Sequence, residues 1–405
     1  MSHTEGESLG RHLSLPLVTF YGLGTIIGAG IYVLVSEVAH TSGTLMPIAF
    51  LTAAAIASLT GLCYAELCCR YPQAAGAVLY VDKAFRQPAL SQLTGFLVLM
   101  TGVVSAATIS RGFVGYLDLY WQVSPELAIF GLCMIMGVIT SIGIRESAWA
   151  ISLITLLEIA GLLFVLGFAS WDKPVMQQAA AMELSGATPI LLGAFLAFYA
   201  FIGFEDMVNL AEEVIEPERN VPRSIVLSIT FSTVLYLGVA ITAVLFMDLE
   251  VLSQSTSPLA LMVADYPAAV AAIGFIGMVA ISNGALTQII MASRMLYGMA
   301  KRKLLPALFA RVNARTQTPL INTWLVTFVI MGFALWLPIA TLAKITSGIM
   351  LLVFALVNLA LLRIKTRHRF EERKPHFAVP RLVPLLGLAA NVSLLLYLLA
   401  GIDIG

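Results

Sequence analysis

The chain has 405 residues, of which 59% are apolar and only 11% are charged, and its mean hydropathy is +0.92. A soluble domain carries about 25% charged residues, so this chain cannot cover a soluble particle with polar surface. Disordered, collagenous and coiled-coil chains are excluded too, because they need a polar or strictly periodic sequence. What remains is a membrane protein, with room for about ten to twelve spans of roughly 20 residues each.

The charge balance and the metal-binding residue types narrow the choice further. The formal net charge is zero, which argues against a nucleic-acid partner. The four cysteines lie in or beside apolar stretches and are interpreted as small apolar fillers. The five histidines lie in tails, in loops or at a span end, which leaves little basis for a metal or haem site. We therefore expect a lipid bilayer as surroundings, no cofactor and no metal.

Long apolar runs predict eleven membrane helices. Their approximate ranges are 13–39, 45–69, 90–117, 126–143, 148–169, 188–211, 224–247, 268–299, 320–338, 340–363 and 383–402. With the N-terminus in the cytoplasm, all but three of the 23 lysines and arginines face the cytoplasm, as the positive-inside rule requires. The exceptions are Arg111, Lys173 and Lys344. We expect a multi-pass protein of the cell (inner) membrane, with residues 1–12 as a cytoplasmic tail and Gly405 outside.

The first span contains a run of glycines that is unusual for a membrane helix. They are Gly22, Gly24, Gly28 and Gly30. One interpretation is close helix packing through small residues. The other is an unwound stretch whose amides and carbonyls face a cavity, because each interior glycine weakens a helix by about 0.5–1 kcal/mol. We favour the second interpretation.

The sixth span contains Gly203, followed by Glu205 and Asp206 within an apolar run. Two adjacent carboxylates are costly there unless they face water, an ion or freed backbone amides. Ending the helix near Phe204 would leave it short, although apolar residues continue to Leu210. The pattern predicts a break in the middle of the span.

The positions of these breaks predict two halves, 13–169 and 188–363, with 383–402 as an extra span. Interrupted helices at matching positions are typical of inverted repeats with a substrate site at the membrane midplane. The N-terminus of a half-helix suits a carboxylate, and the freed carbonyls at a C-terminus suit an ammonium group or a cation. A site with both features fits an α-amino acid.

Several segments resemble the amino acid–polyamine–organocation (APC) superfamily: 24–31, 201–205 with 211–214, 217–225, and 283–286 followed by 293–297 and 305–306. The resemblance covers nearly the whole chain. It implies an all-α, leucine-transporter-like fold of five-plus-five inverted repeats, here with one additional helix where many relatives have two. It also implies alternating access and an amino-acid substrate. Carried over by position, the resemblance implies that amides of Gly28, Ala29 and Gly30 would bind the substrate carboxylate. The ammonium group would be bound by the carbonyls of Ile26, Tyr199, Ala200 and Ile202. The substrate side chain would be bound by Phe198, Tyr199 and Phe204.

Several polar residues are candidates for coupling or gating. Glu158 in the fifth span could carry a proton, bind a cation or be a neutral core residue. In the APC resemblance this position aligns with a lysine of proton-coupled relatives. A lysine could replace a sodium ion electrostatically, but a glutamate has the opposite charge, so this role does not transfer to Glu158. Glu205 and Asp206 are expected to hold freed amides or join a gate. The remaining candidates are Asn283 in the eighth span and the loop residues Glu212, Glu213, Arg219 and Arg223. The loop residues could form salt bridges of a gate, or they could simply be a charged surface exposed to solvent.

These features predict a secondary active transporter, a permease that moves an amino acid by alternating access, by proton symport or exchange. No charged side chain is obviously placed to meet a cationic substrate, so we expect a neutral one. The alternative is a non-transporting amino-acid sensor that uses the same site. An enzyme and a channel are disfavoured, because no nucleophile or metal cluster and no selectivity filter is found. The coupling ion, H⁺ or Na⁺, and the oligomeric state stay open.

Overall fold

The computed structural model describes residues 11–73, 76–142, 148–169, 188–301, 305–313, 315–316, 318–367 and 375–401. Within them the chain is helical and forms no strand, apart from a single parallel bridge between Leu13 and Val214. Most of the predicted N-terminal tail, Lys173 and Gly405 lie outside the described residues.

The long helices follow the predicted spans closely. They are α1 (Leu15–Ser42), α2 (Met46–Arg70), α4 (Pro88–Leu117), α5 (Pro125–Ile142), α6 (Ala148–Phe168), α8 (Thr188–Phe198), α9 (Pro217–Phe246), α12 (Pro267–Lys301), α13 (Leu320–Trp336), α14 (Ile339–Arg367) and α15 (Leu382–Gly401). Several start with proline in the first turn, where the missing N–H has no helical partner in any case. Short elements join them: α3 (Gly76–Phe85), α10 (Leu249–Ser253), α11 (Pro258–Leu261), and the 3₁₀ turns η1 (Gly43–Leu45) and η4 (Ala307–Ala310).

In the part of the chain that is described, nine helical stretches are long and apolar enough to cross a membrane. One of them, Leu15–Arg70, contains both α1 and α2, and the apolar α13 is shorter than the others. A polytopic membrane protein is therefore confirmed, while the count of eleven crossings stays a prediction.

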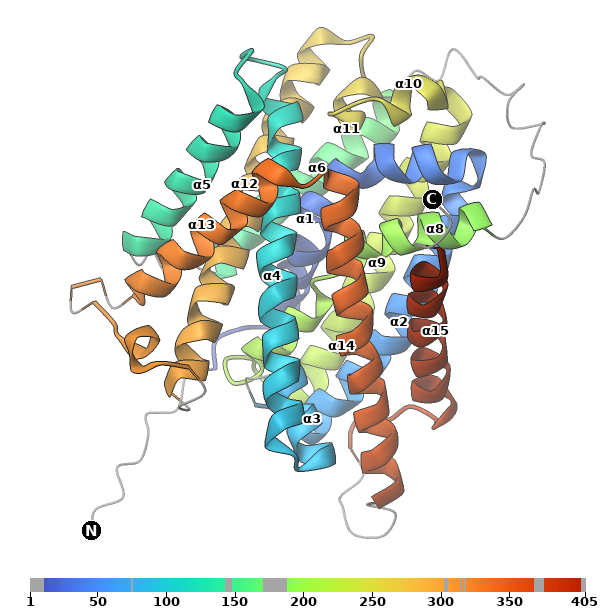
Figure 1. The fold of residues 1–405 in the computed structure, drawn as a ribbon. Coiled ribbons are helices and arrows are strands. Elements are labelled where there is room, and N and C mark those ends of the chain that lie inside the picture. The colour runs from blue at the N-terminus through green and yellow to red at the C-terminus, as the bar shows by residue number, and fades with distance from the viewer. Residues whose placement is uncertain are drawn as a thin grey trace.

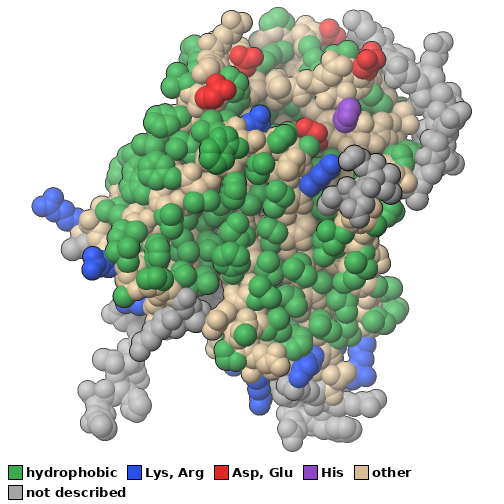
Figure 2. All heavy atoms as spheres, in the orientation of Figure 1, with side chains coloured by type: hydrophobic (Ala, Val, Ile, Leu, Met, Phe, Trp, Pro, Cys, Tyr) green, Lys and Arg blue, Asp and Glu red, His purple; other side chains and the backbone are tan. Residues whose placement is uncertain are grey.

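The helices form one bundle around α1 (Figure 1), which contacts α9, α6, α8 and α12. We call the end with α3 the inner end and the end with α10 and α11 the outer end, following the predicted orientation. In Figure 2 apolar side chains cover the middle of the visible face, most basic ones lie toward the inner end and most acidic ones toward the outer end.

Candidate functional site

Both predicted interruptions are present, and they differ in form. In α1 the only residue with non-helical dihedral angles is Gly28, at φ −1° and ψ −125°, so this break is narrower than an unwound stretch. In the sixth span α8 passes into the turn η2 (Tyr199–Phe201). Ile202 is then extended, Gly203 has φ 128°, and the 3₁₀ segment η3 (Phe204–Leu210) follows. The chain thus changes direction where Gly203 precedes the two carboxylates.

Two hydroxyl groups tie the breaks together. Thr25 Oγ1 donates to Gly203 O at 3.0 Å and also lies 3.0 Å from Gly22 O. The fully buried Tyr236 hydroxyl on α9 lies 2.8 Å from Ile26 O and 3.0 Å from Ala200 O. Because a hydroxyl has one proton, each of these donors is shared between two carbonyls. The contacts occupy acceptor positions on Ile26 and Ala200, two of the four carbonyls that were predicted to meet the ammonium group.

The breaks approach so closely that two glycines are required. A Cβ on Gly30 would lie 2.6 Å from the Ala200 Cα, and one on Gly203 would lie 2.4 Å from Thr25 O. Gly203 also has a positive φ, which L-residues with a side chain rarely adopt. The backbones of spans one and six are therefore in direct contact at the site.

Glu205 holds one of the freed backbone groups. The Gly203 N–H donates to Glu205 Oε2 at 2.9 Å, which satisfies an amide that the broken helix leaves unpaired. The next residue, Asp206, is half-buried and faces a cavity. One of the two predicted acids thus supports the break, and the other faces the space beside it.

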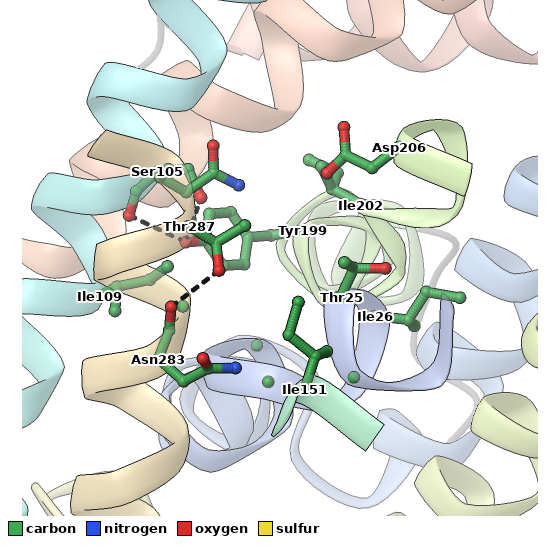
Figure 3. Close-up of a pocket in the computed structure, with 15 residues that line it drawn as sticks. Thr25, Ile26, Ser105, Ile109, Ile151, Tyr199, Ile202, Asp206, Asn283 and Thr287 are labelled. Atoms are coloured by element: carbon green, nitrogen blue, oxygen red, sulfur yellow. Dashed lines mark hydrogen bonds between the residues drawn. The ribbon is translucent and has the colours of Figure 1, made fainter. Parts of the chain in front are cut away.

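A central cavity of about 40 Å³ lies beside the two breaks (Figure 3). Apolar walls come from Ile109 of α4, Ile151 of α6 and the extended Ile202 between η2 and η3. Tyr199 turns its hydroxyl toward Ser105 Oγ at 2.9 Å. The other lining residues are Gly24, Thr25, Ile26, Gly28, Gly30, Asp206, Asn283, Gly284, Thr287 and Gln288.

The structure brings five of the nine predicted substrate-binding residues to this cavity, together with two of the coupling or gating candidates. Among those that line the cavity are Ile26, Gly28, Gly30, Tyr199, Ile202, Asp206 and Asn283. Phe198 and Phe204 are instead fully buried against Phe354, with ring centroids 5.7 and 5.1 Å away, and are not among the lining residues. Of Ala29 only the helical backbone is described.

Sequence reasoning missed several residues of this site. Thr25 was within the glycine run but was not singled out, and Tyr236 is a lone tyrosine in an apolar span. Ser105 is one of several serines and threonines in α4, so nothing in its spacing singles it out. Thr287 and Gln288 follow Asn283 by about one helical turn. Their sequence spacing from Asn283 could therefore have identified them as candidates.

The central cavity adjoins a larger one toward the inner end. This inner cavity has about 570 Å³ and shares Asp206 and Thr287 with the central one. On the outer side α1 and α4 are in close contact: the Tyr116 hydroxyl donates to Tyr32 O at 2.7 Å. A Cβ on Gly112 would lie only 2.4 Å from Val33 Cγ2. The site is therefore closed toward the outer end and adjoins open space toward the inner end.

Glu158 lies deep in α6 and is 1% exposed. Neither carboxylate oxygen has a hydrogen-bond partner among the described residues. The Tyr32 hydroxyl contacts only its backbone, with 3.0 Å to Glu158 O. An unpartnered buried carboxyl group is costly, and the role of Glu158 stays a prediction.

The predicted inner-gate residues Glu213 and Arg219 make separate contacts. Arg219 lies 3.5 Å from Glu216, and both side chains are more than half exposed, which makes this a weak surface pair. Glu213 lines the inner cavity, and its carbonyl accepts from the N–H groups of His12 and Leu13. Glu212 and Arg223 are exposed. The loop is therefore joined to the start of α1 through the backbone.

Interrupted helices that meet beside a cavity in a helical membrane protein are typical of transporters. The model of one family, described as amino acid permease, matches residues 13–402. The chain belongs to the amino acid permease family, as the resemblance to the APC superfamily predicted.

Characterised relatives of the chain are transporters. It is 28% identical to the methylthioribose transporter of Bacillus subtilis, over 99% of this chain and 91% of that protein. It is 26% identical to the branched-chain amino acid permease of Bacillus subtilis, over 98% and 90%. It is also 26% identical to a cationic amino acid transporter of Arabidopsis thaliana, over 90% of this chain and 64% of that longer protein.

Proposed function

We propose that the protein is a secondary active permease that moves a neutral amino acid across the cell membrane by alternating access, by proton symport or exchange. The observation that carries the proposal is the contact of two interrupted helices beside a cavity, with Gly28 and Gly203 at the breaks. The repeats 13–169 and 188–363 would form the five-plus-five core, and 383–402 would be the additional span. The N-terminus would be cytoplasmic and the C-terminus outside.

The backbone atoms suit the two charged groups of an amino acid. Amides of residues 28–30 would receive the carboxylate, because a helix that restarts at a break presents unpaired N–H groups and a positive dipole end. Carbonyls of Tyr199 and Ile202 would receive the ammonium group. Ile26 O and Ala200 O each accept from Tyr236 and could contribute only a remaining lone pair.

The size and walls of the cavity support a small neutral side chain. Its volume is about 40 Å³, and isoleucines supply its apolar walls. A longer side chain would have to pass Asp206 into the inner cavity. Asp206 therefore favours a second candidate, a cationic amino acid whose charged end meets this carboxylate, and cationic transporters are among the relatives.

Glu158 is the proposed coupling residue. Its buried carboxyl group has no hydrogen-bond partner among the described residues, and it follows Ile151 of the cavity wall by about two turns. A carboxyl group that gains and loses a proton there could link proton movement to the rearrangement of α1 and α6. A cation such as Na⁺ at this residue is the alternative.

A thermal-shift screen of the twenty amino acids tests the substrate proposal, because a ligand that binds the folded state raises the melting temperature. We expect small neutral amino acids to give the largest shifts, and arginine and lysine to do so if the second candidate holds. Counterflow of the labelled hit in proteoliposomes then separates a permease from a sensor. A sensor would bind the amino acid without exchanging it.

A further inference from the structure

A second cavity lies at the outer end of the bundle, apart from the proposed transport site. It has about 290 Å³, near the lower limit of roughly 300–1,000 Å³ for ligand pockets. Its walls come from α1, α4, the start of α5, the start of α14 and the segment between α10 and α11. Glu37 of α1 and Arg111 of α4 line it from different helices.

Glu37 and Arg111 place opposite charges in this cavity, and both are half-buried. The Arg111 Nη1 donates to Ala334 O at 2.8 Å, which fixes the guanidinium and leaves its other N–H groups for further contacts. In the described part of the chain, no Arg111 nitrogen lies within 4 Å of a Glu37 carboxylate oxygen, so the two residues do not form an ion pair. His40 and Lys344 lie near enough to Glu37 to act on its charge without pairing with it.

The floor of the outer cavity separates it from the central one. Val33 and Gly112 line the outer cavity and are in tight contact with each other. The bond from the Tyr116 hydroxyl to Tyr32 O is part of the same closed layer. A ligand could therefore occupy the outer cavity while the central site adjoins the inner cavity.

We propose that the outer cavity binds a second zwitterionic amino acid, with the ligand carboxylate on Arg111 and its ammonium group on Glu37. The proposal rests on the proposed function only in taking the ligand from the transported class. An outer gate made of these two residues would be paired in a conformation that is closed to the outside, and here they are unpaired. Two separated, opposite charges on facing helices match the two charged groups of an amino acid.

Occupancy of this site would join α1 to α4 across the outer path. The central site could reopen outward only if α1 and α4 move apart, so a bound zwitterion would bias the equilibrium between the inward-facing and outward-facing states. The outer amino acid would thus regulate the transport cycle from the opposite side of the membrane.

The test uses the full chain in lipid nanodiscs, with Gly28→Leu to fill the central cavity. L-alanine is the zwitterionic probe, N-acetyl-L-alanine the anionic one and L-alanine methyl ester the cationic one, and the readout is the thermal shift. We expect L-alanine alone to stabilise Gly28→Leu. Adding Glu37→Gln or Arg111→Lys should raise the apparent dissociation constant by at least about tenfold, because a charge-assisted hydrogen bond is lost or misplaced.

Asp118→Asn is the matched control, because Asp118 is exposed on the turn that ends α4 and is not among the residues that line the cavity. A shift that disappears in Gly28→Leu overturns the outer site and leaves the central one intact. Equal shifts with all three probes, or an unchanged affinity in Glu37→Gln, also overturn it. A zwitterion-specific shift in Gly28→Leu, combined with no amino-acid counterflow by the unsubstituted protein, would support the outer site and remove the proposed transport.

Discussion

Gly28 borders the central cavity, and a Cβ built on it would have no heavy atom within 4 Å. A larger side chain there would enter the cavity rather than the packed core. We predict that Gly28→Leu abolishes uptake, as measured in proteoliposomes. Gly131→Leu is the control, because Gly131 of α5 also has open space around its Cβ and lies outside the site. Wild-type uptake in Gly28→Leu would refute the proposed site.

The Tyr236 hydroxyl, from a third helix, contacts both broken segments through Ile26 O and Ala200 O. Tyr236→Phe removes this donor and leaves buried carbonyls with one partner fewer, at a cost of about 1–3 kcal/mol in the free energy of unfolding. We expect reduced stability together with a lower uptake rate. Tyr266→Phe is the control, because Tyr266 is 49% exposed. Equal stability of the two variants in chemical unfolding would show that Tyr236 does not hold the breaks together.

At the scale of the helical element, the break in the sixth span depends on Gly203. Gly203→Ala would have to adopt φ 128° and would place its Cβ 2.4 Å from Thr25 O. A strained dihedral costs about 1–3 kcal/mol, and the contact with the backbone adds to it. Gly43→Ala is the matched control, because Gly43 has φ 52° and no heavy atom near its Cβ. Thermal unfolding should rank Gly203→Ala well below Gly43→Ala; the reverse order would contradict the close approach of spans one and six.

A buried ion cluster joins α2 to α14 and to the chain before α15. Glu66 has no exposed side-chain surface and lies 2.8 Å from Arg70 Nη2 and 2.6 Å from Lys365 Nζ. Its Oε2 also accepts from the Val379 N–H at 2.8 Å. The Arg70 contact was predicted from helical spacing; the other two join residues about 300 positions apart and could not be.

We predict that Glu66→Gln lowers the free energy of unfolding by about 3–5 kcal/mol, because it leaves the Lys365 ammonium group buried without a carboxylate. Adding Lys365→Met should restore part of the loss. Glu216→Gln, which removes the exposed partner of Arg219, should have little effect. Denaturant unfolding in detergent measures all of them. No recovery in the double variant would mean that Lys365 does not depend on Glu66.

At the scale of the whole molecule, the sequence predicted what is local. Apolar length predicted the helices, and Gly203 beside two acids predicted the second break. Tertiary packing decided the rest: Phe198 and Phe204 follow a helical pattern that no single sequence can assign to a cavity or to an aromatic core. The bond from Tyr236 to Ile26 spans 210 positions, and the outer cavity exists only because α1 and α4 come together.

Energy coupling is a property of the whole transport cycle, and substitutions of Glu158 test it most directly. If Glu158 carries the coupling proton, Glu158→Gln should lose pH-dependent accumulation, because an amide cannot take up or release that proton. Counterflow should persist, since exchange of one amino acid for another needs no net proton movement. Glu158→Asp, which keeps a titratable group, should retain some pH dependence.

The measurement is uptake into proteoliposomes with and without an imposed pH gradient. An unchanged pH profile in Glu158→Gln would assign the proton to another group, and Asp206, which faces both the central and the inner cavity, would be the next residue to test.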